Sequence, residues 1–170
     1  APDLPPPWRR ATMAALVEEV IGGRVDVRRP IAELRKIADD HGVHWEESYG
    51  PGKLLLEIYE KTTEATLWGP IHVCDYPKEV SPLSRDHREM PGMVERFECI
   101  VARRELQNAF SELIDPGEQQ LRFEAQAAAA ASGDGEARPQ IDRNYIRALE
   151  PGLPPTPATG TRTPRPPVPR

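Results

Sequence analysis

The sequence predicts an α+β fold, in which helices and strands occupy separate stretches of a chain of 170 residues. Apolar residues recur at helical spacing through the first third, with capping and breaking residues between the segments. A stretch of alternating, β-branched residues follows near residue 70, and a proline-rich tail closes the sequence. This length allows one ordinary domain or a part of a larger one.

Composition limits the classes of function. A hydrophobic content of 38% allows a core, although 6% aromatic residues and 20 prolines make that core lean. The net charge of −5 argues against a general binder of polyanions, which needs clustered Lys and Arg. No apolar run approaches the length of a membrane span, and no signal peptide is visible. Cys74 and Cys99 have neither metal-ligand spacing nor a disulfide framework, so we expect two buried thiols in a cytoplasmic protein.

Three helices are predicted in the first third of the chain. Thr12 can cap the first, whose apolar residues recur at helical spacing, and Gly22 ends it. Pro30 suits the start of a second helix over residues 31–41. A third is expected over about residues 53–67, with an inner side formed by Leu54, Leu55, Ile58 and Tyr59.

Residues 70–76 alternate and are rich in β-branched side chains, which predicts a strand. Prolines 77 and 82 end it and begin a loop. Asp75 and His87 could form a metal or acid–base site, but His87 lies in a run of alternating charges, which favours a solvated loop.

Residues 94–123 are ambiguous from the residues alone. Glu98, Glu105 and Glu112 are seven apart, which would place them on one face of a helix. On a strand, Asn108, Phe110 and Glu112 would share one face instead. Composition over residues 102–114 favours a helix, whereas residues 97–101 favour a strand. Periodicity does not decide between them.

The last part of the chain contains two further helices and a tail. Residues 116–131 predict a helix, residues 133–139 a break, and Asp142 a cap for a short helix that ends at Leu149. Residues 151–170 have no acidic and almost no large apolar side chain. We therefore expect a disordered tail with polyproline II character.

Several motifs in order resemble class II lysyl-tRNA synthetases. They are PPWRRATM at residues 6–13, HVCDYPKEVSPL at 72–83, the run from RFE through RRE to SEL at 96–113, and ALEPGLPPT at 148–156. The resemblance implies a partial class II catalytic domain over residues 1–150, with a helical insertion at about 12–67 and a disordered tail at 151–170. It also implies that residues 96–101 and 106–113 are neighbouring antiparallel strands.

The resemblance assigns roles to five residues. Glu98 and Glu105 match acids that bind Mg²⁺ and ATP in the family, which suits the preference of Mg²⁺ for oxygen ligands. Glu112 matches the residue that pairs with the lysine ammonium, and Asn108 and Phe110 match residues of the same pocket. The implied parent reaction is ATP-dependent activation of lysine and its transfer to tRNA by a cytoplasmic homodimer.

The sequence also departs from the family. Arg103 replaces a small residue before the RE pair, and Ile114 replaces a polar one. The arginine of the second signature motif would lie upstream of Ala1, and the third motif is replaced by PATGTRTPRPP. These departures predict a truncated or frame-shifted fragment that is inactive alone. Two alternatives stay open: a non-catalytic remnant that binds lysine, ATP or a partner, and a paralogue that attaches lysine to a protein or lipid.

Overall fold

A computed structural model describes residues 5–135 and 137–161. A single five-stranded sheet organises the chain, with the strands in the order β1-β2-β3-β4-β5. The strands are β1 Arg9–Thr12, β2 Ile71–Pro77, β3 Met93–Val101, β4 Arg104–Ser111 and β5 Pro157–Thr161. The α-helices are α1 Met13–Ile21, α2 Ile31–Asp40, α3 Pro51–Thr62, α4 Pro116–Ala131 and α5 Arg143–Leu149, and two short 3₁₀ turns are η1 Glu64–Thr66 and η2 Lys78–Val80.

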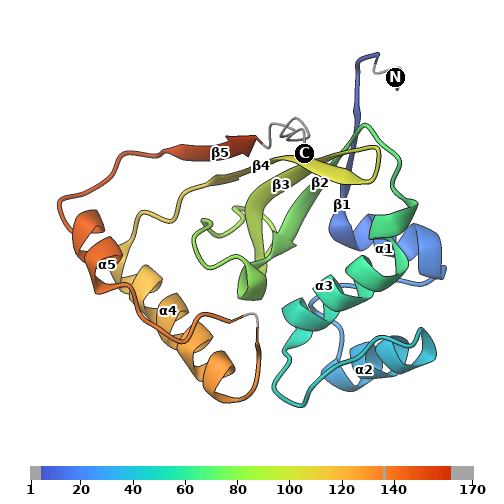
Figure 1. The fold of residues 1–170 in the computed structure, drawn as a ribbon, viewed down its shortest axis with the longest axis horizontal. Coiled ribbons are helices and arrows are strands. Elements are labelled where there is room, and N and C mark those ends of the chain that lie inside the picture. The colour runs from blue at the N-terminus through green and yellow to red at the C-terminus, as the bar shows by residue number, and fades with distance from the viewer. Residues whose placement is uncertain (1–4, 136, 162–170) are drawn as a thin grey trace, which may run out of the picture.

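The predicted α+β class is confirmed, but the sheet is mixed rather than purely antiparallel. β1 pairs with β2 in parallel, whereas the pairs β2–β3, β3–β4 and β4–β5 are antiparallel. The parallel pair arises because the chain leaves β1 through three helices before it returns as β2 (Figure 1). Among the described residues, no helix is long and apolar enough to cross a membrane.

The first helix begins without a linker after the first strand. Thr12 is the last residue of β1, where it pairs with Cys74, and it also caps α1 through a hydrogen bond from the Ala15 amide to Thr12 Oγ1. Gly22 ends α1 with φ of 79°, a left-handed conformation that glycine adopts readily. The predicted caps of this helix are therefore confirmed.

The third helix is shorter than predicted. It begins at Pro51 and ends at Thr62, and the chain then tightens into η1 instead of continuing to Leu67. Thr62 Oγ1 donates to the carbonyl of Ile58 at 2.7 Å, a competing side-chain bond of the kind that weakens a helix end.

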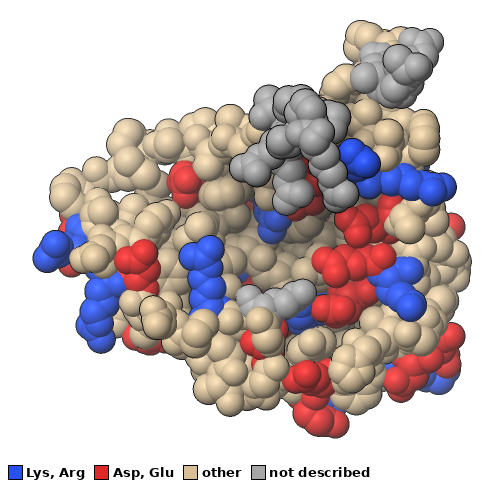
Figure 2. Space-filling model, in the orientation of Figure 1, with Lys and Arg blue, Asp and Glu red and all other residues tan. Residues whose placement is uncertain are grey.

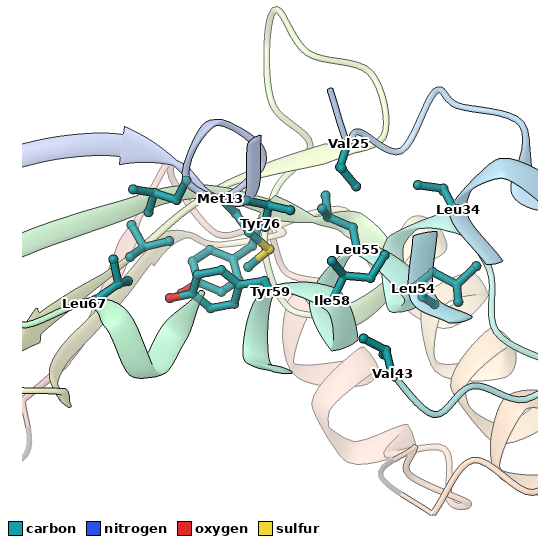
Figure 3. Close-up of a cluster of buried hydrophobic side chains, with 14 of the residues drawn as sticks. Met13, Val25, Leu34, Val43, Leu54, Leu55, Ile58, Tyr59, Leu67 and Tyr76 are labelled. Carbon is teal, nitrogen blue, oxygen red and sulfur yellow. The ribbon is translucent and has the colours of Figure 1, made fainter. Parts of the chain in front are cut away.

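One apolar core lies between α1, α2, α3 and the β2 side of the sheet (Figure 3). Leu54, Leu55 and Ile58 of α3 are fully buried there, and Tyr59 is 3% exposed. Their spacing along α3 places them on one side of the helix, as the sequence predicted. On the visible surface, acidic and basic side chains are interspersed over these helices (Figure 2).

The two last helices lie under the opposite end of the sheet (Figure 1). Asp115 caps α4 and Asp142 caps α5, each by accepting a bond from a backbone amide three residues on. Both predicted helices are therefore confirmed.

The expected disorder of residues 151–170 is wrong for Pro157–Thr161. These residues form β5, which pairs with β4 over five residues, and Gln107 also donates to Thr159 Oγ1 at 3.1 Å. Strand pairing satisfies the backbone groups and needs no large apolar side chain, so composition alone misjudged this segment. Residues 162–170 lie outside the described residues.

Candidate functional site

The β3–β4 hairpin carries the candidate residues, and it is antiparallel as predicted. Its connection is a two-residue turn of Ala102 and Arg103, with φ of 53° and 62°. Two-residue hairpin turns favour positive φ at both central positions, where glycine or asparagine is usual. The guanidinium of Arg103 lies 5.8 Å from the centre of the Trp68 ring.

A bulge places the two candidate metal ligands on the same face. Glu98 pairs with Asn108. The register then shifts between Cys99 and Ile100, so that Ile100 pairs with Glu105 and Leu106 is an extra residue on β4. Simple alternation would have put Glu105 on the face opposite Asn108. The bulge returns it to the face that carries Glu98.

Negative charge gathers at this part of the sheet. Burial raises the pKa of Glu64, and the neighbouring carboxylates of Glu98 and Glu105 raise it further. The pKa of Tyr59 is raised by burial, with Glu64 and Glu98 adding to the effect. A cation bound here would relieve this repulsion.

Glu98 and Glu105 therefore suit Mg²⁺, which proteins often hold with one or two carboxylates while substrate phosphates complete its shell. No group of three or more His, Cys, Asp and Glu side chains within residues 5–135 and 137–161 is arranged to hold a metal by itself. The charge and the oxygen ligands fit a metal that arrives with a phosphate ligand.

Arg96 links Glu98 to the rest of the site, and the sequence had predicted no role for it. It donates to Asn108 Oδ1 at 3.2 Å and to Ser81 Oγ at 3.1 Å, and it pairs with Glu98 Oε1. Its guanidinium also lies 4.4 Å from the centre of the Tyr76 ring. These contacts hold Asn108 and Glu98 in fixed positions. No local pattern identifies them, because they join four separate segments.

A cavity of about 290 Å³ lies between the hairpin and α4. Asn108 and Phe110 both contribute to its wall. Ser81, Phe123 and Gln126 line it from the facing side.

Glu112 lies beside this cavity rather than in its wall. It follows β4, forms an isolated bridge with Ser84, and accepts a hydrogen bond from Tyr145. Its Oε2 atom is buried and has no hydrogen-bond partner among the described residues. Burial raises the pKa of Glu112, while the bond from Tyr145 lowers it. The structure thus brings Asn108 and Phe110 together in one cavity wall. Glu112 lies next to them, because it forms a bridge with Ser84, which lines the same cavity.

Arg122 of α4 holds the loop that forms the facing wall. Its side chain is 7% exposed and donates to the carbonyl oxygens of Ser81 and Ser84. It also pairs with Asp86 at 2.6 Å and with Glu118 at 3.1 Å. The loop and α4 are therefore joined by buried polar contacts.

The loop that carries His87 is not simply solvated, contrary to the expectation. Asp75 Oδ1 lies 3.6 Å from His87 Nε2, and both side chains are largely buried. His87 Nδ1 accepts from the amides of Glu89 and Met90, so its proton lies on the nitrogen that faces Asp75. This pair lines a different cavity from Asn108 and Gln126.

Comparison with known sequences agrees with this fold and hairpin. The family described as tRNA synthetases class II (D, K and N) matches residues 2–163, so the chain belongs to that family.

Curated relatives of the chain carry a more particular name. A lysine–tRNA ligase of Synechococcus sp. (strain CC9902) is 47% identical over 159 residues, which are 93% of this chain and 32% of that protein. Lysine–tRNA ligases of Trichormus variabilis and Porphyromonas gingivalis are 45% and 44% identical over 93% of this chain and 28% and 27% of their own lengths. The chain thus spans under a third of the curated relatives that it matches.

Proposed function

We propose that this chain is the lysine- and metal-binding part of a lysine–tRNA ligase. The whole protein would activate lysine with ATP and transfer it to tRNA, as a homodimer in the cytoplasm. The names of the relatives support this reaction class. The assignment of lysine as the substrate rests on Glu112, whose buried Oε2 lacks a hydrogen-bond partner among the described residues.

An unpaired buried carboxylate oxygen is costly, so it favours a ligand that brings a hydrogen-bond donor and a positive charge. The ammonium of lysine has both. Phe110 would cover the aliphatic stem, and Asn108, held by Arg96, would orient the polar end. An amino acid with a long stem and a terminal cation fits this set of groups.

Glu98 and Glu105 would hold the Mg²⁺ that accompanies ATP. When bound, that ion neutralises phosphate charge during attack by the lysine carboxylate. Arg96 positions Glu98 for this role by pairing with one carboxylate oxygen, Oε1. The acids and the amino acid cavity lie on one hairpin, so ATP and lysine would meet along β3 and β4.

Calorimetric titration of the full chain tests this proposal. L-lysine should bind, and Glu112→Gln should weaken it by about a hundredfold or more, because removal of one member of a buried charge pair typically costs about 3–5 kcal/mol. L-norleucine, which lacks the ammonium, should bind weakly to both proteins. Glu105→Gln should leave lysine affinity unchanged and reduce the Mg²⁺ dependence of ATP binding.

Glu124→Gln is the matched control, since Glu124 is exposed on α4 and bonds to Gln120. It should leave both titrations unchanged. Lysine binding that is equal in wild type and Glu112→Gln would contradict the assignment of Glu112.

A further inference from the structure

Three buried oxygen atoms without hydrogen-bond partners belong to the segment after β4 and to α4. Among the described residues they are Glu112 Oε2, Gln119 Oε1 and Gln126 Oε1, while the remaining unpaired oxygens are the hydroxyls of Tyr59 and Tyr76. All three can only accept hydrogen bonds. Most buried polar groups are paired, so a group of unpaired acceptors requires an explanation.

Gln119 already has a structural role. It is fully buried, and its Nε2 donates to the carbonyl of Pro82 at 3.0 Å. Together with Arg122 it fixes α4 against the loop of residues 81–86. Its amide is therefore committed to that contact.

Gln126 is different, because it lines the cavity itself. It follows Arg122 by four residues and Gln119 by seven, so all three lie on the same side of α4. It shares the cavity wall with Asn108 and Phe110. The anchored residues before it hold this turn of the helix against the sheet.

The donors of the cavity wall do not satisfy Gln126. Arg96 is engaged with Asn108, Ser81 and Glu98 and is stacked on Tyr76. Arg138 also lines the cavity, but Gln126 Oε1 has no bond to any described residue. The cavity thus contains an acceptor that needs a donor from a ligand.

We propose that Gln126 is a substrate-binding residue that accepts a hydrogen bond from the terminal ammonium of lysine. This inference rests on the proposed function and adds to it. An ammonium group has three donors, and Glu112 can accept only part of them. Gln126 takes another from the α4 side of the cavity. It therefore contributes to selection for an amino acid with a terminal cation.

Titration of lysine and norleucine into the full chain tests the role of Gln126. Gln126→Met keeps the approximate volume and removes the acceptor, so lysine affinity should fall about tenfold, as for a hydrogen bond to a charged group. Norleucine affinity should stay the same, because norleucine has no ammonium. Gln126→Glu, in contrast to Gln126→Met, keeps an acceptor at this position. It should retain lysine affinity and lower norleucine affinity.

Gln120→Met is the control on the same helix, because Gln120 is exposed and bonds to Glu124. It should change neither affinity, and thermal melting should show that all variants are folded. Equal losses for lysine and norleucine in Gln126→Met would overturn the inference as a packing effect. Unchanged lysine affinity in Gln126→Met, with loss in Glu112→Gln, would overturn it and leave the proposed function intact. Absence of lysine binding by the wild type would overturn both.

Discussion

At the β2 end of the sheet, α1 and α3 are held mainly by apolar contacts, whereas α4 at the β4 end is held largely by polar ones. Leu16, Leu54 and Ile58 are buried in the core at the first end. At the second end, Arg122 and Gln119 join α4 to a loop through backbone carbonyls. Apolar burial is non-directional, while hydrogen bonds fix positions. The end of the molecule whose geometry is fixed by hydrogen bonds is therefore the end that contains the candidate lysine cavity.

The largest effect should come from the apolar end. Ile58→Ala should lower the free energy of unfolding by about 2–5 kcal/mol, because it leaves a cavity in a core that cannot fully collapse. Chemical denaturation measures this. Leu121→Ala is the control, since Leu121 is 61% exposed on α4, and it should cost less than about 0.5 kcal/mol. Similar costs for the two variants would refute the assignment of the core.

A smaller effect is expected at the polar end. Arg122→Met should cost about 1–3 kcal/mol, because it leaves the carbonyls of Ser81 and Ser84 without their donor. Hydrogen exchange should accelerate in α4 and in residues 81–86, with α3 unchanged. Arg122→Lys, which keeps the charge, should lose less protection. Faster exchange spread evenly over α3 and α4 would contradict the separation of the two ends.

The smallest effect concerns the pH dependence of stability. Burial raises the pKa of Glu112 above its value in the unfolded chain, so the folded state holds its proton more tightly. Glu112 therefore opposes folding increasingly as pH rises from about 4.5 through that raised pKa. Glu112→Gln should raise the melting temperature at pH 7 and give little gain below pH 4. A gain that grows on acidification would reverse the sign and disprove this explanation.

Local signals predicted the elements that depend on local contacts. Thr12 and Gly22 mark α1 in the sequence as they do in the structure. The Ala102–Arg103 turn could not be recognised in the same way, because its two residues are not typical of positive φ. Residues 102–114 have helical propensity, yet pairing with β3 and β5 makes most of them a strand. Tertiary pairing outweighed propensity there, and only the family resemblance anticipated it.

The candidate site was predicted in part for a similar reason. The family motif identified Asn108 and Phe110, which share a cavity wall. Arg96 and Arg122 act through contacts between distant segments, and Gln126 shares a cavity wall with residues far from it in the chain; a single sequence reveals neither. The bulge that places Glu105 on the same face as Glu98 depends on strand register and was equally invisible.

The double role of Thr12 limits how the chain can change in length. One residue ends β1 and caps α1, so no spacer separates the register of the sheet from the rotation of the helix. An insertion of a single residue after Thr12 would turn α1 by about 100° around its axis. That rotation would carry Leu16 and Val17 away from the core. Homologous proteins should therefore vary in length after α1, while the junction itself keeps a constant number of residues.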